Sequence, residues 1–387
     1  MRWLRPYSGA DFLKILHTSD LHLGKNLSEE SFHDDQEYIL NQITEIVKEK
    51  DISVVMIPGD IYDKTIPRAD AIKLFDDFLT ALSKMDVNVL ITSGNHDSNE
   101  RLAFGSKIFS KFNIHIATSY GGRIEKVSVE DVDFYLLPFL KPFHLKDLME
   151  KDEYENINNS NRMMEWILNR EELDKDKKNI LLAHQFVQKG ELPPKQSDSE
   201  SVGTLDPIQS SLFDDFDYVA LGHLHRPQSV GRETIRYSGT PLKYSFSEAE
   251  DKKSVVIIDT DDIENFELVE LTPLRDMQIL KGKFDQVMNM EPSDDIIKVE
   301  LLDENTILSP MERIRERFSN AIALEFVNIY RIMDTGDDDE KGEKIKGDEA
   351  SPYELFDLFF KEQNGREMTE DEENCIKSII ESLEGVE

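Results

Sequence analysis

Residues 15–22 read ILHTSDLH, a short apolar run that leads directly into Asp20, Leu21 and His22. The same arrangement recurs along the chain, because other β-branched runs of strand length are also followed at once by polar residues. Strands are predicted at residues 15–19, 54–58, 87–92, 134–138, 180–183, 218–221 and 255–259. Between the second and third, apolar residues from Ile72 to Leu82 recur at spacings of three and four, which predicts a helix. This alternation predicts an α/β layered fold.

Side chains that can bind metals gather where these strands end. Seven of them follow the strands in chain order: Asp20, His22, Asp60, Asn95, His184, His223 and His225. Ligands bind at the carboxyl ends of the strands in an open α/β sheet, so we expect these side chains to converge. Mixed imidazole and carboxylate ligands favour Mn, Fe, Zn or Co over Ca or Mg. One carboxylate, most simply Asp60, can bridge two cations ~3.5–4 Å apart, as in a two-metal hydrolase.

Each of these residues alone also has an ordinary structural explanation. A single Asp after a strand is most often a turn or a helix cap, and the GNHD of residues 94–97 can be a simple turn. A lone histidine more often packs or lies at the surface, which is the interpretation for His17, His33, His115 and His144. The conjunction favours a metal site, because the other five of the nine histidines directly follow apolar strands together with Asp and Asn.

The composition limits the class of protein. With 387 residues the chain is long enough for two to three domains, and no stretch approaches the ~20 apolar residues of a membrane helix, so no membrane partner is expected. The single cysteine, Cys375, cannot form an intramolecular disulfide, and we expect a reducing cytoplasm. The formal net charge of −34 repels polyanions at long range. Binding of nucleic acid would therefore need a local basic patch, bound cations or a partner chain.

The pattern changes after Pro273. Strand-like runs at 278–284 and 296–302, followed by a helix-like run at 311–318, predict a small α+β domain over residues 274–333. Residues 334–351 are acidic and predict a solvated linker, and residues 352–387 predict a pair of short amphipathic helices. The first of these helices carries an apolar face made of Leu355, Leu358, Phe359 and Phe360. This face either captures a partner helix or folds back on the first domain.

In order, the motifs D-x-H, G-D, G-N-H-D, a lone H after a strand and G-H-x-H resemble the calcineurin-like metallophosphoesterase superfamily. Within it, four segments closely resemble the SbcD family of nuclease subunits from bacterial SbcCD complexes: HTSDLHLGK (17–25), GDIYD (59–63), SGNHDS (93–98) and GHLHRPQ (222–228). YSGTPLKYSFSE (237–248) is similar to the segment that follows in that family. The resemblance is strong over residues 14–270. It implies a layered β-sandwich flanked by helices over residues 14–273, a small α+β domain that caps DNA, and a C-terminal helix pair that docks a partner.

The resemblance also implies roles for single residues. It implies one metal held by Asp20, His22, Asp60 and His225, and a second held by Asp60, Asn95, His184 and His223. His96 takes the position of the family's catalytic histidine, and Asp97 is expected either to hold the His96 imidazole or to cap the turn. Two divalent cations outweigh Asp20 and Asp60 by two positive charges, which can bind a phosphodiester in a chain of net charge −34.

The activity implied is that of an Mn²⁺-dependent DNA nuclease, an exonuclease on duplex ends and an endonuclease on hairpins or single strands. Its implied setting is a cytoplasmic complex with an SbcC-type ATPase, as a homodimer within a heterotetramer, in DNA repair, recombination and replication. The chain departs from its relatives in about 13 residues ahead of the first strand, and in Asp63, where some related nucleases have a histidine. The latter departure would make transition-state stabilisation depend more on His96.

Two other functions stay open at this point. The first is a metallophosphoesterase that acts on a phosphoprotein or a small nucleotide. Phosphoprotein phosphatases of the superfamily typically show G-D-x-V-D-R-G and G-N-H-E, from which Ile61, Tyr62, Asp63 and Asp97 depart. The second is a non-catalytic scaffold, and the intact set of ligand residues together with His96 argues against it.

Overall fold

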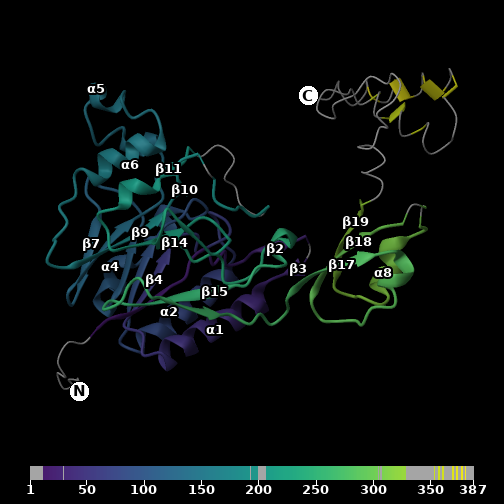
Figure 1. Cartoon of the computed structure of the whole chain (residues 1–387), viewed down its shortest axis with the longest axis horizontal. Helices are drawn as coiled ribbons and strands as arrows, with labels where there is room; N and C mark the ends of the chain where they lie inside the picture. Colours follow the sequence, from purple (N-terminus) through teal and green to yellow (C-terminus); the bar gives the residue numbers. More distant parts are fainter. Residues whose placement is uncertain are drawn as a thin grey trace. The chain divides into compact units, whose positions relative to one another are not determined.

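In a computed structural model, the described residues are 12–28, 30–191, 193–198, 206–303, 305 and 307–327, together with eleven single residues between Tyr353 and Ile380. The chain divides into two compact units, Met1–Ile329 and Tyr330–Glu387. Two six-stranded sheets dominate the first unit (Figure 1).

The first sheet has the strand order β16-β15-β1-β4-β5-β6. Its four parallel strands are β1 (Lys14–His17), β4 (Val54–Pro58), β5 (Asn88–Thr92) and β6 (Ile114–Ala117), while β15 (Ser254–Asp259) and β16 (Glu267–Glu270) pair antiparallel. Helices α1 (His33–Glu49) and α2 (Ala69–Ser83) cover one of its faces, because their apolar stripes pack on Leu16, Val55 and Val89 (Figure 1).

The second sheet has the order β13-β14-β12-β9-β8-β7. Its parallel strands are β8 (Val132–Leu137), β9 (Lys178–His184), β12 (Tyr218–Gly222) and β14 (Arg232–Tyr237), with β7 (Glu125–Val129) and β13 (Gln228–Val230) antiparallel at the edges. Helix α6 (Ser160–Leu168) and the short helix η3 (Ser210–Phe213) pack on its outer face.

The two sheets face each other through a shared apolar core. Alternate residues point inward from each strand, so Ile15 and Met56 of the first sheet meet Phe134 and Leu182 of the second. Burying one such side chain contributes about 1.5–3 kcal/mol. The prediction of a layered β-sandwich flanked by helices is therefore confirmed, and each of the seven predicted strands is present.

Short elements complete this part of the chain. They are β2 (Asn26–Leu27), β3 (Glu30–Ser31), α3 (Asn99–Leu102), α4 (Ser106–Phe109), η1 (Ser110–Phe112), η2 (Pro142–Leu145), α5 (Lys151–Tyr154), β10 (Val187–Gln188), β11 (Ile208–Gln209) and η4 (Phe246–Glu248).

A smaller three-stranded sheet follows Pro273. Its strands β17 (Met277–Gly282), β18 (Ile296–Leu301) and β19 (Ala321–Phe326) are all parallel, and α7 (Phe284–Val287) and α8 (Pro310–Arg315) connect them. Val299, Ile314 and Phe318 lie in a core of its own. Strands and helices thus alternate here, whereas an α+β domain would segregate them. The boundaries of this domain stay a prediction.

Most of the predicted C-terminal features lie outside the described residues. This holds for the linker at 334–351 and for Leu355, Leu358 and Phe359, while Phe360 is helical and half-buried. In the described part of the chain, no helix is long and apolar enough to cross a membrane.

Candidate metal centre

The seven predicted ligand side chains come together at one edge of the sandwich. They follow β1, β4 and β5 of the first sheet and β9 and β12 of the second, and β4 contacts both β9 and β12 across the core. Because these strands all run parallel within their sheets, their carboxyl ends present the side chains at the same edge. Residues more than 200 positions apart therefore meet in one site.

One group consists of Asp20, His22 and His225. Each offers a ligand atom, and these atoms lie within 4.8 Å of one another. The two Nε2 atoms of His22 and His225 face each other at 3.1 Å. Such a convergence of nitrogen and carboxylate lone pairs suits a cation.

The second group surrounds Asn95. Its Oδ1 atom lies 3.0 Å from Nε2 of His184 and 3.0 Å from Nδ1 of His223. Asp60 joins the two groups, because its Oδ2 atom is 3.3 Å from Nε2 of His184 and 3.6 Å from Nε2 of His22. This is the position that a carboxylate shared by two cations requires.

A carbonyl oxygen sets the tautomer of His184. Nδ1 of the ring donates to the carbonyl of Pro58 at 2.9 Å, and a carbonyl can only accept, so the proton sits on Nδ1. Nε2 is therefore the ring nitrogen that faces Asn95 and Asp60, and it is the one available to a cation. A hydrogen bond of this kind on the far nitrogen is typical of histidines that bind metals.

The backbone at these ligands is strained. Asp20, His22, Asp60 and His223 have φ angles of 54°, 44°, 49° and 103°, in the left-handed region that side chains other than glycine rarely adopt. Hydrogen bonds between two loops hold this conformation: the N–H of Asp20 donates to the carbonyl of Gly59, and that of His22 to the carbonyl of Asp60. Four of the ten non-glycine residues with positive φ in the described part of the chain are therefore predicted ligands.

Three glycines make room for Asp60 and His184. A Cβ atom on Gly94 would lie 2.1 Å from Oδ1 of Asp60, and one on Gly59 would lie 2.2 Å from Nδ1 of His184. At Gly222 it would lie 1.8 Å from the carbonyl oxygen of Pro58. The glycines of the G-D, G-N-H-D and G-H-x-H motifs are therefore a steric requirement of the site, which sequence reasoning had not assigned.

Burial shapes the ionisation of the site. It raises the pKa of Asp20 and lowers the pKa of His223 to about 3. Burial alone would lower the pKa of His184, but the carboxylates of Asp60 and Asp20 raise it to about 9. Nε2 of His22, Nε2 of His184 and Nδ1 of His223 all face the buried carboxylate of Asp60 or the amide oxygen of Asn95. A set of buried carboxylates and imidazoles that converge in this way fits two divalent cations, which would neutralise the carboxylates and accept nitrogen lone pairs.

His96 lies beside the predicted ligands, and one nitrogen of its ring is held by a backbone carbonyl. Its Nδ1 donates to the carbonyl of Asp63 at 2.8 Å, and its ring centroid is 4.9 Å from that of His22. Among the eight predicted site residues, only Asn95 and His96 are half-exposed, so a substrate would approach over these two.

Asp97 was expected either to hold the His96 imidazole or to cap the turn, and in the structure it caps the turn. Its carboxylate accepts the backbone N–H groups of Gly94, Ile61 and Tyr62 at 2.9, 3.2 and 3.0 Å. The partner of the His96 ring is instead the Asp63 carbonyl. Holding the His96 imidazole through Asp97 was therefore the wrong alternative, because the carboxylate is engaged by the turn.

Sequence reasoning also missed two side chains, Gln36 and Tyr244, that hold the loop containing Asp20 and His22 in place. Gln36 of α1 donates to the carbonyl of His22 at 2.8 Å, and the Tyr244 hydroxyl donates to the carbonyl of Leu21 at 2.6 Å. Gln36 also donates to Tyr244, at 2.9 Å. The sequence signal for Tyr244 was its place in YSGTPLKYSFSE, whereas Gln36 has no motif around it.

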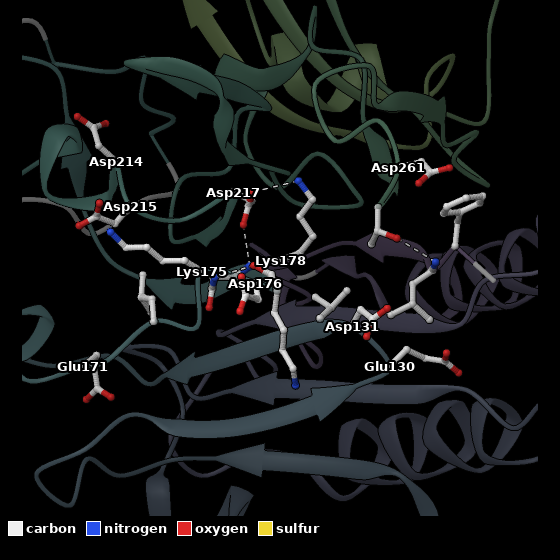
Figure 2. A pocket seen from close by; sticks show the side chains of 17 residues that line it. Glu130, Asp131, Glu171, Lys175, Asp176, Lys178, Asp214, Asp215, Asp217 and Asp261 are labelled. Atoms are coloured by element: carbon white, nitrogen blue, oxygen red, sulfur yellow. Dashed lines mark hydrogen bonds and ion pairs between the residues drawn. The ribbon is translucent and has the colours of Figure 1, made fainter. Parts of the chain in front are cut away.

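A cavity of about 1000 Å³ is lined by many acidic side chains together with Lys175 and Lys178 (Figure 2). Most of its lining lies at the amino ends of β1, β8, β9 and β12, and Thr260 and Asp261 follow β15. Lys178 pairs with Asp217 there at 3.3 Å, and Asp217 also accepts the backbone N–H of Asn179 at 2.8 Å. None of the predicted site residues lines this cavity.

Comparison with known proteins places this geometry in a family. A family model described as calcineurin-like phosphoesterase matches residues 13–227, and a model described as Type 5 capsule protein repressor C-terminal domain (SbcD_C) matches residues 273–364. One similar solved structure is a dimetal phosphatase from Danio rerio, at 13% identity and a TM-score of 0.38, covering 67% of this chain and 99% of that one. So distant a likeness carries no argument.

The two family matches together support an SbcD-type nuclease subunit. The first match spans more than half of the chain and contains all seven predicted ligand residues. The chain therefore belongs to the calcineurin-like phosphoesterase family, and it is a metal-dependent phosphodiesterase.

Proposed function

We propose that this chain is the nuclease subunit of an SbcCD-type complex, an Mn²⁺-dependent enzyme that processes DNA ends in repair, recombination and replication. It would act as an exonuclease on duplex ends and as an endonuclease on single strands and hairpins. The observation that carries the proposal is the convergence of Asp20, His22, Asp60, Asn95, His184, His223 and His225 at one edge of the sandwich. The match of residues 273–364 to the SbcD_C model supports DNA as the substrate class.

The residues divide into two sets of ligands that share Asp60. Asp20, His22, Asp60 and His225 would hold one cation, and Asp60, Asn95, His184 and His223 the second. When bound, two divalent cations supply charge neutralisation of a phosphate and a water activated for in-line attack. The mixture of imidazole and carboxylate ligands supports Mn²⁺ among the candidate ions.

His96 would act on the phosphodiester itself. Since Nδ1 donates to the Asp63 carbonyl, the proton on Nδ1 is held and Nε2 is left for the substrate. In the imidazolium form, Nε2 can donate to a phosphate oxygen or protonate the leaving 3′- or 5′-oxygen. Its backbone N–H donates to Oδ1 of Asp60 at 2.9 Å, which ties the histidine to the shared carboxylate.

The partners follow from the same family relation. We propose an SbcC-type ATPase as the partner, in a cytoplasmic heterotetramer that contains two copies of this chain. Phe104, Ile108 and Phe112, just beyond the GNHD turn, are 83%, 61% and 62% exposed and offer an apolar face for the second copy. The predicted face at Leu355, Leu358, Phe359 and Phe360 is the proposed docking element for the ATPase.

The decisive experiment compares substrates. The chain should hydrolyse bis(p-nitrophenyl) phosphate faster than the monoester and only with Mn²⁺, and it should cleave radiolabelled hairpin and blunt duplex DNA, more efficiently with the ATPase. A preference for the monoester without cleavage of DNA would instead support a phosphatase for phosphoproteins or small nucleotides. Truncation after residue 351 should abolish co-purification with the ATPase and leave diester hydrolysis intact.

A further inference from the structure

A buried ion pair lies directly behind His225. Glu248, at the end of η4, is 0% exposed, and Lys253, just before β15, is 5% exposed. Oε2 of Glu248 accepts a hydrogen bond from Nζ of Lys253 at 2.5 Å. Burying two charges costs free energy because both lose their hydration, so a buried ion pair needs a structural or functional explanation.

Both members of the pair contact His225. Oε1 of Glu248 lies 3.7 Å from Nδ1 of the imidazole, and Nζ of Lys253 donates to the His225 carbonyl at 2.8 Å. Lys253 also donates to the hydroxyl of Thr240 at 2.9 Å, and the N–H of Thr240 donates to the same carbonyl at 3.1 Å. Glu248 therefore contacts the ring of His225, and Lys253 and Thr240 hold its backbone carbonyl.

The geometry points to Glu248 as a positioning residue that orients His225 toward a metal ion, with Lys253 as the counter-charge. Nδ1 of His225 faces Glu248, while Nε2 faces His22 at 3.1 Å. A carboxylate behind a metal-binding imidazole keeps the proton on the far nitrogen and makes the near nitrogen a stronger ligand. His184 has a neutral carbonyl in the equivalent place, so Glu248 would give His225 the stronger support. This inference rests on His225 being a metal ligand, as proposed above.

Ser197 completes the environment of the carboxylate. Its hydroxyl is buried and donates to Oε1 of Glu248 at 2.5 Å, and the N–H of Asp198 donates to the Ser247 hydroxyl at 3.0 Å. The segment at residues 193–198 is thereby attached to the support of His225. Glu248 keeps one orientation because both of its oxygens are engaged.

The competing explanation is a purely structural ion pair that ties η4 to β15. The chain offers a matched control for it in Asp133 of β8, a carboxylate that is 1% exposed. Asp133 accepts from Ser128 at 2.6 Å, from Lys126 at 3.0 Å and from Lys177 at 3.1 Å. It therefore has the same kinds of partner as Glu248, and none of them is a predicted metal ligand.

The test is a calorimetric titration of the metal-free full chain with Mn²⁺. In Glu248→Gln, which keeps the size of the side chain, one of the two Mn²⁺ sites should bind about 10–100-fold more weakly. The other site should change less than about threefold. Asp133→Asn should lower the melting temperature and leave both Mn²⁺ affinities unchanged. If Glu248→Gln behaves like Asp133→Asn, Glu248 is only structural and the inference is wrong.

A second variant covers the case in which Glu248→Gln fails to fold because Lys253 is left buried and unpaired. Glu248→Gln combined with Lys253→Met removes both charges together, which proteins often tolerate. It should show the same weakening at one site, and two normal affinities would overturn the inference.

Metal titration also separates this inference from the proposed nuclease activity. If the wild-type chain binds two Mn²⁺ ions but does not cleave DNA, the proposed substrate is wrong and the role of Glu248 still stands or falls on the titration. A wild-type chain that binds no Mn²⁺ would overturn both.

Discussion

Asp60 is the residue on which both halves of the centre depend. Its Oδ2 atom lies near His184 and His22, which belong to different groups, while Oδ1 accepts the backbone N–H of His96. Burial alone would raise its pKa, but the contact with His184 holds the pKa well below its usual range. The carboxylate is therefore ionised and available to cations near neutral pH.

Replacement of this shared carboxylate should be the most damaging single change. Asp60→Ala should abolish Mn²⁺-dependent hydrolysis of bis(p-nitrophenyl) phosphate and remove binding of the second metal in calorimetry. The control is Asp63→Ala, because the Asp63 carboxylate pairs with Lys25 at 2.9 Å while its backbone carbonyl, which holds His96, remains. Equal residual activity in the two variants would contradict a bridging role for Asp60.

His96 should be separable from metal binding. His96→Gln should retain two metals, as seen by calorimetry or anomalous scattering, yet lose about 10²–10⁴-fold in turnover, because the acid that serves the phosphodiester is gone. The Asp63 carbonyl can still accept from the glutamine amide, so the loop should stay in place. Loss of one metal in this variant would instead identify His96 as a ligand.

At this scale the sequence predicted the candidate ligands but not the side chains that support them. The predicted ligands lie at or just after strand ends, so motif and strand end coincide at Asp20, Asp60 and His184. Gln36 and Tyr244 act through a hydrogen bond that joins residues 208 positions apart, which no local pattern encodes. The contact of Glu248 with His225 is also not visible in a local pattern, because it joins residues from two different motifs.

At the scale of elements, Gly59, Gly94 and Gly222 lie at or near strand ends and leave space for the predicted ligands. Gly94→Ala should lower Mn²⁺ affinity or the yield of folded protein, because the new methyl group would meet Oδ1 of Asp60 at 2.1 Å. Gly121→Ala is the matched control, since a Cβ there has no atom within 4 Å. Calorimetry and thermal melting of the two variants measure the difference, and similar results for both would disprove the steric argument.

A pH-dependent contribution to stability is expected at Asp133. Burial alone would raise its pKa, but hydrogen bonds from Ser128, Lys126 and Lys177 lower the pKa to about 2. A carboxyl group whose pKa is lowered on folding stabilises the native state above its unfolded pKa of about 3.9, and this stability is lost as the pH falls toward 2. The contribution should be about 2.6 kcal/mol at pH 7.

Urea unfolding measures this contribution directly. Asp133→Asn should lower the free energy of unfolding at pH 7, and its deficit relative to the wild type should be about halved at pH 3. A deficit that is the same at both values of pH would mean that the charge of Asp133 contributes nothing.

Burial explains only part of the difference between the strands that were predicted and those that were missed. The seven predicted strands are mostly buried runs of apolar residues, and β7 and β16 are edge strands with exposed polar residues, but β6 and β14 were missed although they are mostly buried. Helix α1 was also missed, although its buried Ile39, Ile43 and Val47 recur at spacings of four. In the small domain, strand order and direction depend on contacts between segments, so the sequence could not separate a parallel β-α-β-α-β arrangement from an α+β one.

For the whole molecule, the net charge makes bound cations a condition of the proposed activity on DNA. A chain of net charge −34 repels a polyanion, and the buried carboxylates of Asp20 and Asp60 add to that repulsion at the site. Two divalent ions would carry more positive charge than these two carboxylates carry negative charge, so the potential at the site would become positive. Metal binding should therefore matter for stability as well as for catalysis.

Removal of metal should destabilise the two-sheet sandwich, because the predicted ligands come from both sheets and from distant parts of the chain. A ligand that binds only the native state stabilises it by about 2.7 kcal/mol when its concentration is 100 times Kd. EDTA should thus lower the melting temperature by on the order of 5 °C relative to saturating Mn²⁺, as measured by calorimetry. Asp60→Ala, which loses the shared ligand, should show a much smaller shift on addition of Mn²⁺. Identical melting temperatures for the wild type with Mn²⁺ and with EDTA would mean that these side chains do not form a metal centre.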